Sequence, residues 1–232
     1  MLIYALSNRR LQNMKKLTLI PLVLLLLATT ACSGTKETDA QTSAKNDIQT
    51  GTWSEDGKVF TNEWSGIKFT LPDGYVAASE EELATMASAN QEIIAEASND
   101  LEASIAMARV AYDFLVQPSD GTGLPNMVLM YENIGLSVAT KSLDENGYLD
   151  VMSIQFKEME SQGMVYSEVE RTTATVAGAE WTCGKYSIND GIALNDFYMR
   201  KVDGVMYQLS ITYSQDTADA AATLLSAITA IE

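Results

Sequence analysis

Hydrophobic and polar positions divide the chain into three zones. Residues 17–28 are almost all apolar, whereas residues 33–51 contain a single large aliphatic residue, Ile48. From about Val59 the apolar positions recur with the periods of strands and helices. The apolar run is shorter than the roughly 20 residues that a transmembrane helix needs, but it suits the core of a signal peptide. The pattern predicts a signal peptide (1–31, with Met14 as an alternative start), a flexible polar tether (32–52) and a single domain (53–232).

Strand patterns fill most of the predicted domain. Alternating apolar and polar residues bounded by turn residues are typical of strands, and in the last run Val205 and Tyr207 point to one face. An Ala-Gly pair at 177–178 and Asp-Gly pairs at 190–191 and 203–204 separate the last four runs, and Asp-Gly is a strong hairpin signal. The predicted strand runs are 58–75 (two strands around a turn at 65–66), 107–118, 126–133, 165–176, 179–188, 192–202 and 205–214.

Three segments carry helical patterns. The first begins with Ser79 and Glu82, which have the spacing of a capping box. The second has the same spacing at Ser142 and Glu145, and the third is an amphipathic segment at the C-terminus. The apolar stripes consist of Leu83, Met86, Ile93, Ile94 and Ala97 in the first, Leu149, Met152, Phe156 and Met159 in the second, and Leu224, Leu225, Ile228 and Ile231 in the third.

The order of these elements predicts the fold class. Two strands, a helix, two strands, a helix, about four strands and a last helix follow one another. Strands joined by tight turns pair antiparallel, and helices lying between such hairpins cover the faces of the sheet. The sequence therefore predicts an α+β fold in which an antiparallel sheet is sandwiched by helices.

Several segments at successive positions support a family resemblance. They are NEWSGIKFTLPDGY, DFLV, SLDENGYLD, VAGAEW and YMRKVDGVMYQLSITYS. From about Val59 to the C-terminus the chain resembles the Mog1/PsbP-like α/β/α sandwich, and more narrowly the small bacterial lipoproteins of that fold. The resemblance implies a role without catalysis, because members of this fold act as assembly factors or small-GTPase partners. It does not say which of these roles applies.

The junction between the apolar run and the polar tether resembles a bacterial lipoprotein signal. Basic residues precede the run, small residues follow it, and Cys32 comes directly after them. The resemblance implies that the sulfur of Cys32 receives a diacylglycerol and that the mature protein, carrying fatty acids such as palmitate, is anchored outside the cytoplasm. Thr29 stands where such signals usually have Leu. The alternative is cleavage by an ordinary secretory peptidase, which would release a chain that begins at Cys32.

Charge and composition exclude several classes of function. Because the predicted signal peptide holds four basic and no acidic residues, the mature chain has 11 basic and 31 acidic residues, a net charge of −20. Such a chain repels nucleic acid. The chain has no histidine, so a Ser-His-Asp triad, a Cys-His pair or a His-ligated zinc site cannot be built. With Cys32 used for the anchor, Cys183 has no partner for an intrachain disulfide and is expected to be a small buried group.

Three motifs that could carry chemistry have simpler interpretations. Residues 65–68 and 33–36 match S-x-x-K, but no K-T-G motif accompanies them, and neither is predicted to start a helix. Glu168 and Glu170 could share a strand face and act as an acid–base pair, although a solvated strand face explains them as well. Residues 144–147 resemble part of a calcium loop, but a helix start accounts for them.

Trp53 and Trp64 are the candidate binding residues, because amphipathic aromatic side chains are favoured at binding surfaces. The alternative for Trp64, and for Trp181, is packing against the sheet. We expect no cofactor and no metal, and a membrane and an envelope protein as partners. The predicted function is that of a non-catalytic, lipid-anchored protein. The alternatives are a carboxylate-based enzyme that acts on envelope glycans and a sensor domain for a small ligand or cation.

Overall fold

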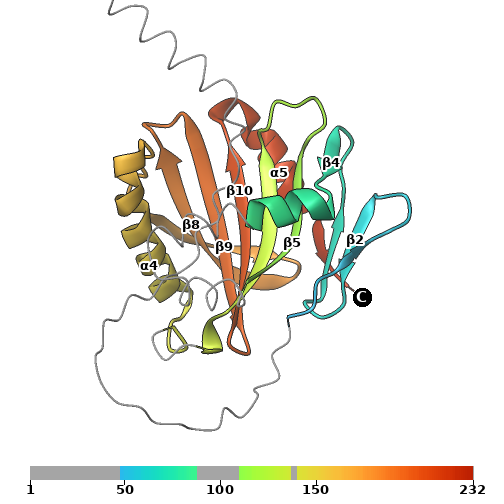
Figure 1. Cartoon of the computed structure of the whole chain (residues 1–232), viewed down its shortest axis with the longest axis horizontal. Coiled ribbons are helices and arrows are strands. Elements are labelled where there is room, and N and C mark those ends of the chain that lie inside the picture. Colours follow the sequence, from blue (N-terminus) through green and yellow to red (C-terminus); the bar gives the residue numbers. More distant parts are fainter. Residues whose placement is uncertain (1–47, 88–109, 137–139, 232) are drawn as a thin grey trace, which may run out of the picture.

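The strands form two antiparallel sheets in the computed structural model of the protein, which describes residues 48–87, 110–136 and 140–231 (Figure 1). The wide sheet has the order β4 (Tyr75–Ala77), β5 (Val110–Pro118), β6 (Asn126–Asn133), β10 (Val205–Tyr213), β9 (Ala193–Val202), β8 (Ala179–Ile188) and β7 (Glu170–Val176). The small sheet has the order β1 (Thr52–Trp53), β2 (Val59–Asn62), β3 (Ile67–Thr70) and β11 (Ile228–Ala230).

Helices lie on both faces of the wide sheet. The longer elements are α4 (Glu145–Glu158), α5 (Ala218–Ser226) and a helix that begins at residue 80 and reaches residue 87, the last described position before a gap. Short 3-10 turns are η1 (Ile134–Leu136), η2 (Met159–Gln162) and η3 (Gln215–Thr217). These elements confirm the predicted α+β fold with an antiparallel sheet covered by helices.

The two faces of the wide sheet bury different layers. On one face the small sheet and α5 enclose an aromatic core that includes Phe60, Phe69, Phe114 and Trp181. On the other face α4 packs over β8 and β9. In Figure 1, α4 and the small-sheet strand β2 lie on opposite sides of the wide sheet. Because β11 pairs with β3, the first and last strands of the domain meet in one sheet.

Local sequence explains the hairpins that build the wide sheet. Ala177-Gly178 and Asp203-Gly204 both have positive φ angles, as the tight turns of two-residue hairpins require. The predicted strand runs of the second half match β7 to β10, except that the run predicted from residue 165 becomes a strand only at Glu170. The two runs before them match β6 and the described part of β5. The alternation predicted for the last run is also confirmed, since Val205, Tyr207, Leu209 and Ile211 all lie in the aromatic core.

Two predicted helix boundaries are wrong. Helix α5 ends at Ser226, and Ile228 is the first residue of β11 rather than part of the helix. The reason is tertiary, because Ile228 pairs with Phe69 of β3 and its side chain is buried in the aromatic core. The second wrong boundary is the start of α4, for which the sequence predicted Ser142 as the capping residue. Helix α4 begins at Glu145, and its N-cap is Asp144, whose carboxylate accepts a hydrogen bond from the Gly147 N–H at 2.8 Å. Asp is as good an N-cap as Ser, and its charge favours the helix N-terminus.

The other helix predictions are confirmed for the residues that the structure describes. Ser79 and Glu82 form the expected capping box, with Ser79 N–H 2.7 Å from the Glu82 carboxylate and Glu82 N–H 3.3 Å from the Ser79 hydroxyl. Met86 of the same stripe is buried, whereas the later positions, residues 93–97, lie outside the described residues. The stripe of α4 is buried against the sheet through Leu149, Met152, Phe156 and Met159.

Candidate functional site

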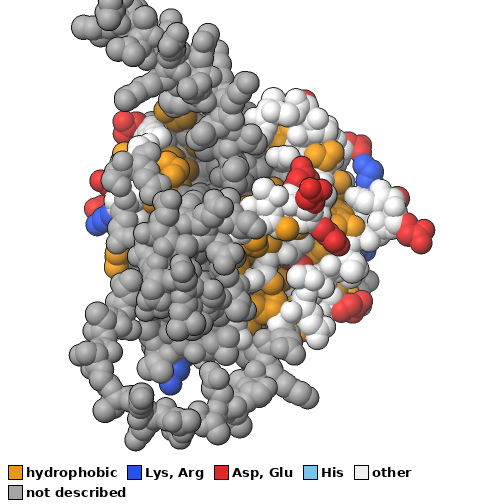
Figure 2. All heavy atoms as spheres, in the orientation of Figure 1, with side chains coloured by type: hydrophobic (Ala, Val, Ile, Leu, Met, Phe, Trp, Pro, Cys, Tyr) orange, Lys and Arg blue, Asp and Glu red, His pale blue; other side chains and the backbone are white. Residues whose placement is uncertain are grey.

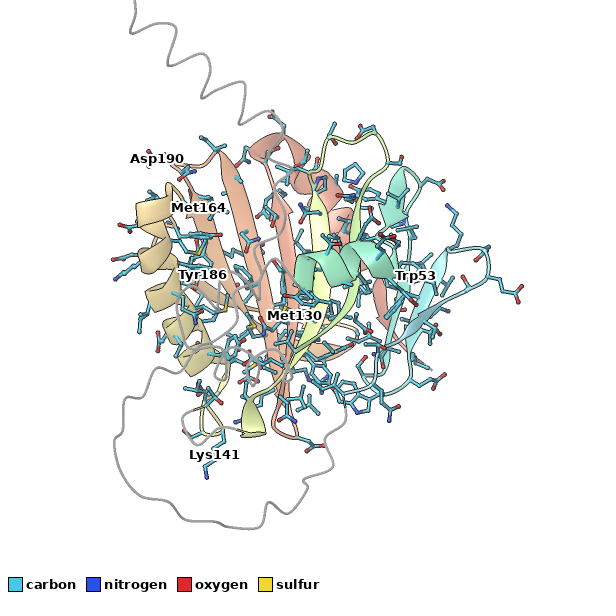
Figure 3. The ribbon with its side chains drawn as sticks, in the orientation of Figure 1. Trp53, Met130, Lys141, Met164, Tyr186 and Asp190 are labelled. Atoms are coloured by element: carbon cyan, nitrogen blue, oxygen red, sulfur yellow. The ribbon has the colours of Figure 1, made fainter. Side chains whose placement is uncertain are left out.

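The predicted site residues do not come together in the structure. Cys32 lies outside the described residues. Trp53 is half-buried in β1, with its ring 5.4 Å from that of Phe60 and 6.1 Å from that of Phe114. Figure 3 shows it among the side chains between the small sheet and β5. Its contacts are those of a core residue that keeps one edge at the surface, and a binding role for Trp53 stays a prediction.

Trp64 lies in the turn after β2 and contacts a different set of rings. Its ring is 5.1 Å from Tyr131 and 5.4 Å from Tyr207, and the side chain is half-buried. Trp181 is almost fully buried, and its ring N–H donates to the Val176 carbonyl at 3.1 Å. Packing against the sheet is therefore confirmed for Trp181, whereas Trp64 both packs and reaches the surface, so its binding role stays a prediction.

A buried carboxylate, Asp113, is the centre of the most connected polar cluster. It lies at the irregularity of β5 between Tyr112 and Phe114 and accepts three hydrogen bonds. The donors are Gly51 N–H at 2.7 Å, Asn62 Nδ2 at 2.8 Å and the Tyr131 hydroxyl at 2.8 Å. The irregularity turns the Asp113 side chain towards the N-terminal segment instead of into solvent.

The same cluster holds the beginning of the domain. Asn62 Nδ2 also donates to the Gln49 carbonyl at 2.9 Å, so residues 49–51 are bound to both sheets before β1 begins. A Cβ atom at Gly51 would lie 2.4 Å from the Phe60 ring, which shows how close the segment runs to β2. Residues 49–52, which the sequence assigns to the tether, are thus already fixed to the domain.

The cluster is poorly suited to acid–base or nucleophilic chemistry. Burial raises the pKa of Asp113, although its hydrogen bonds act in the opposite direction. Burial and the neighbouring Asp113 raise the pKa of Tyr131 far above its ordinary value, so this hydroxyl stays protonated. Ser65 Oγ lies 2.9 Å from that hydroxyl, and Lys68 of the same S-x-x-K match is exposed in β3. Ser65 thus has a protonated tyrosine, not a base, beside it.

Two further acids are buried elsewhere. Glu132 lies on the face covered by α4, where the Tyr148 hydroxyl donates to it and Gln208 Nε2 donates to the Tyr148 hydroxyl at 2.5 Å. Asp196 of β9 lies 3.2 Å from the Tyr213 hydroxyl and 3.8 Å from Lys185 Nζ, and burial raises its pKa.

These acids are too far apart to act as a pair. Asp113 and Asp196 are on strands three positions apart in the sheet, a lateral separation of about 14 Å, and Glu132 projects from the opposite face. The pair predicted from the sequence is a different one, and its members Glu168 and Glu170 are both exposed. The missed acids had one signal in the sequence, namely a single charge inside an otherwise apolar strand run, as in AYDFLV and LNDFYM.

The structure places the stretch that resembles a calcium loop, residues 144–147, and the second cysteine, Cys183. Asp144 caps α4 and Glu145 accepts the Lys201 N–H at 2.7 Å, so this stretch is a helix start. Within the described ranges, no group of three or more His, Cys, Asp or Glu side chains could hold a metal ion. Cys183 is buried and free, and burial raises the pKa of its thiol to about 11, as expected for an inert packing group.

A surface groove of about 530 Å³ lies between β7, the end strand of the wide sheet, and β11, the end strand of the small sheet. It is lined by the end of β7 and the following turn (Val176, Ala177), by one face of α5 (Ala222, Leu225) and by β11. The groove adjoins the aromatic core, because Val176 accepts the Trp181 ring N–H. None of its lining residues is charged. On the face that Figure 2 shows, acidic side chains are scattered among uncharged and hydrophobic ones, with few basic side chains between them.

In the part of the chain that the structure describes, no helix has the length and apolar character that crossing a membrane requires.

Comparisons with known proteins give structural neighbours only. No family model and no curated protein matches the sequence. The solution structure of cyanobacterial PsbP (CyanoP) from Synechocystis sp. PCC 6803 is similar with 14% identity and a TM-score of 0.46, over 87% of this chain and 98% of that chain. LpqN of Mycobacterium tuberculosis, which is involved in cell envelope biogenesis, is similar with 14% identity and a TM-score of 0.34, over 70% and 82%. These similarities do not say what this chain binds.

Proposed function

We propose that this protein is a non-catalytic lipoprotein, anchored outside the cytoplasm through Cys32, whose acidic domain binds or assists a protein partner of the cell envelope. The observation that carries the proposal is the sharp sequence of zones at the N-terminus. An apolar run with a basic leader ends at Cys32, a polar segment follows, and the folded domain is already fixed by hydrogen bonds at Gln49 and Gly51.

The polar segment has a length suited to a tether. Residues 33–47 separate Cys32 from Ile48, which packs against the aromatic core. A flexible chain of this length has a root-mean-square span of about 20 Å. The domain would therefore search a thin layer next to the membrane.

The charge of the mature chain fits such an arrangement. A diacylglycerol supplies two acyl chains, which anchor a protein stably without help from basic residues. A net charge of −20 keeps the domain itself from lying flat on anionic lipid. The acidic surface remains available to a partner.

The buried polar groups support a binding role rather than catalysis. Asp113 accepts bonds from the N-terminal segment, and Glu132 receives a bond from α4 through Tyr148. Each thus joins a peripheral segment to the sheet. Groups used in this way stabilise the fold and are not free to exchange protons with a substrate.

Substitution of Cys32 tests the anchor. In cells, Cys32→Ser should move the protein from the membrane fraction to the periplasm or medium and abolish incorporation of labelled palmitate. Cys183→Ser is the matched control, because it removes the other thiol without touching the anchor, and it should leave both readouts unchanged. A Cys32→Ser protein that still sediments with membranes after alkaline washing would refute the lipid anchor.

Crosslinking in cells tests the partner. The anchored protein, crosslinked and purified, should carry one dominant envelope protein that is reduced or lost in the Cys32→Ser variant. Recovery of no partner from cells in which the protein is folded and anchored would contradict the binding role.

A further inference from the structure

The groove between β11, α5 and the end of β7 has two free sheet edges beside it. Among the described strands, β11 is the last strand of the small sheet and β7 is the last strand of the wide sheet. The lining residues Thr175 and Val176 come from β7, and Ile228 and Ala230 come from β11. The groove is therefore bordered by backbone that can pair with a further strand.

The hydrogen-bond pattern shows which backbone groups β11 presents outward. The Ala227 carbonyl accepts from Thr70 N–H at 3.1 Å, and Ile231 N–H donates to the Gly66 carbonyl at 3.0 Å. Groups at alternate positions of an antiparallel strand point to opposite sides. The N–H and C=O groups of Ile228 and Ala230 therefore point away from β3, to the outer edge.

The side chains of the groove suit a strand with small residues. Ala177, Ala222 and Ala230 leave room beside the backbone, while Leu225 and Val176 provide apolar contact. Hydroxyl groups of lining Thr and Ser residues can hydrogen-bond with an incoming peptide.

Charge identifies the kind of partner. The mature chain carries a net charge of −20, and exposed Asp219 lies one turn before Ala222 on the α5 face that lines the groove. A second copy would bring the same negative charge to the groove, whereas a segment with Lys or Arg at its ends would be attracted.

We infer that the groove binds an extended segment of a partner protein, with small or β-branched residues flanked by Lys or Arg, which adds as a strand to the edge of β11. This mode uses main-chain hydrogen bonds for affinity and side-chain pockets for specificity. The inference rests on the proposed partner-binding function, but it does not depend on the lipid anchor.

The test uses the full-length protein in detergent micelles and a fluorescent peptide, KVSVAVSVK. The peptide should bind, and the affinity should fall with rising salt because the contacts include opposite charges. A peptide of the same charge with alternate prolines, KVPVPVPVK, should bind much more weakly, because it lacks the N–H groups along one of its two edges and because proline disfavours pairing within a sheet. Absence of binding by KVSVAVSVK, or equal binding of both peptides, would overturn the inference.

Two variants of neighbouring α5 residues separate the groove from general charge. Ala222→Arg fills the groove and should weaken peptide binding by about tenfold or more, since the segment loses its contact with α5. Thr223→Arg adds the same charge at an exposed position that does not line the groove, and it should change the affinity by less than about threefold. Equal losses in the two variants would show a charge effect alone and contradict the groove.

A backbone variant provides an independent measurement. Ala230→Pro removes an outward N–H of β11 and leaves the bonds to β3 in place, so peptide binding should fall about fivefold while circular dichroism stays unchanged. If the folded Ala230→Pro protein binds the peptide as tightly as the original protein does, the inference that the peptide pairs with β11 is wrong.

A concentration-dependent dimer that Ala222→Arg abolishes would make a second copy the occupant and overturn the proposal. A partner still crosslinked in cells by the Ala222→Arg protein would refute the groove but leave the proposed function standing.

Discussion

The two faces of the wide sheet are closed in different ways. One face is covered by the small sheet and α5, which come from the two ends of the described domain and meet where β3 pairs with β11. On the other face α4 packs over β8 and β9 through Met152, Phe156 and other apolar residues. Each face contains one buried acid that reaches across the layers, Asp113 on the first and Glu132 on the second.

The two faces of the wide sheet differ in how easily their contacts can adjust. On the face with the small sheet, the Asp113 carboxylate accepts the main-chain N–H of Gly51, and Gly51 lies directly against the backbone of β2. On the α4 face the buried hydrogen bonds from Tyr148 to Glu132 and from Gln208 to Tyr148 join side chains, although Glu145 also accepts the Lys201 main-chain N–H. Four of the ten buried residues in that cluster are methionines, which adapt to their surroundings. We therefore expect the face with the small sheet to be the rigid one and the α4 face to tolerate change.

Removal of the Asp113 carboxylate should have the largest effect. Asp113→Ala removes the shared acceptor of three hydrogen bonds, from the Gly51 N–H, Asn62 Nδ2 and the Tyr131 hydroxyl, which should lower the free energy of unfolding by about 4 kcal/mol. Urea unfolding measures it, and hydrogen exchange should show that residues 49–53 lose protection first. The exposed acid Asp73, replaced by Ala, is the control and should cost less than about 1 kcal/mol. A similar loss for both variants would contradict the special role of Asp113.

The titration of Asp113 sharpens the same point. Burial raises its pKa in the folded protein above the ordinary value of 3.8, so the folded state binds this proton more tightly than the unfolded chain. Its contribution to stability is greatest below the ordinary pKa, declines as pH rises through the raised pKa, and is constant above it. Asp113→Asn should therefore flatten the dependence of unfolding free energy on pH in the range above the ordinary pKa of 3.8. An unchanged pH dependence would show that this carboxyl does not titrate in that range.

A methyl group at Gly51 should have the next largest effect. The added Cβ would lie 2.5 Å from the Thr61 carbonyl oxygen and 2.4 Å from the Phe60 ring, and the carbonyl belongs to a paired strand. We expect Gly51→Ala to cost about 2–3 kcal/mol in thermal or urea unfolding. Gly135→Ala, where a Cβ meets nothing closer than 3.4 Å, should cost less than about 1 kcal/mol. Equal stability of the two variants would mean that the N-terminal segment moves aside.

The buried bond of the α4 face should be weaker. Tyr148→Phe keeps the ring but removes the donor to Glu132 and the acceptor for Gln208 Nε2. We expect a loss of about 2 kcal/mol in urea unfolding, because two buried polar groups lose a partner that α4 can partly replace by shifting. A loss larger than that of Asp113→Ala would reverse the ranking of the two faces.

Much of this architecture follows from the sequence. The Asp-Gly and Ala-Gly turns and the alternation of Val205, Tyr207 and Leu209 depend on local backbone preferences, and the structure agrees with them. The stripe of α4 could be recognised for the same reason. Ile228 could not be assigned correctly, because an apolar residue after a helix fits another turn of helix as well as a strand, and only its pairing with Phe69 decides.

The candidate sites were less predictable. Asp113 and Glu132 have functions that depend on partners 16 or more residues away in the sequence, and no spacing rule connects Asp113 with Gly51. The groove is even harder to predict from the sequence, because its lining comes from β7, α5 and β11, which are adjacent only in the folded domain. Trp53 and Trp64 could be recognised in the sequence as aromatic residues near the tether, but the rings that they contact could not be predicted.

The smallest expected effect, at Gly184 of β8, contrasts most directly with Gly51. A Cβ there would lie 2.6 Å from Leu149 Cδ2 and 3.2 Å from Val169 Cγ2, and both contacts are with the ends of side chains. Because Leu149 belongs to α4, the helix can shift or the side chain can change rotamer, and Gly184→Ala should cost about 1 kcal/mol, less than half the loss at Gly51. Urea unfolding of the two alanine variants under the same conditions measures this difference. If Gly184→Ala is the more destabilising of the two, the α4 face is the rigid one, and the helix rather than the small sheet limits how the domain can adapt to a partner.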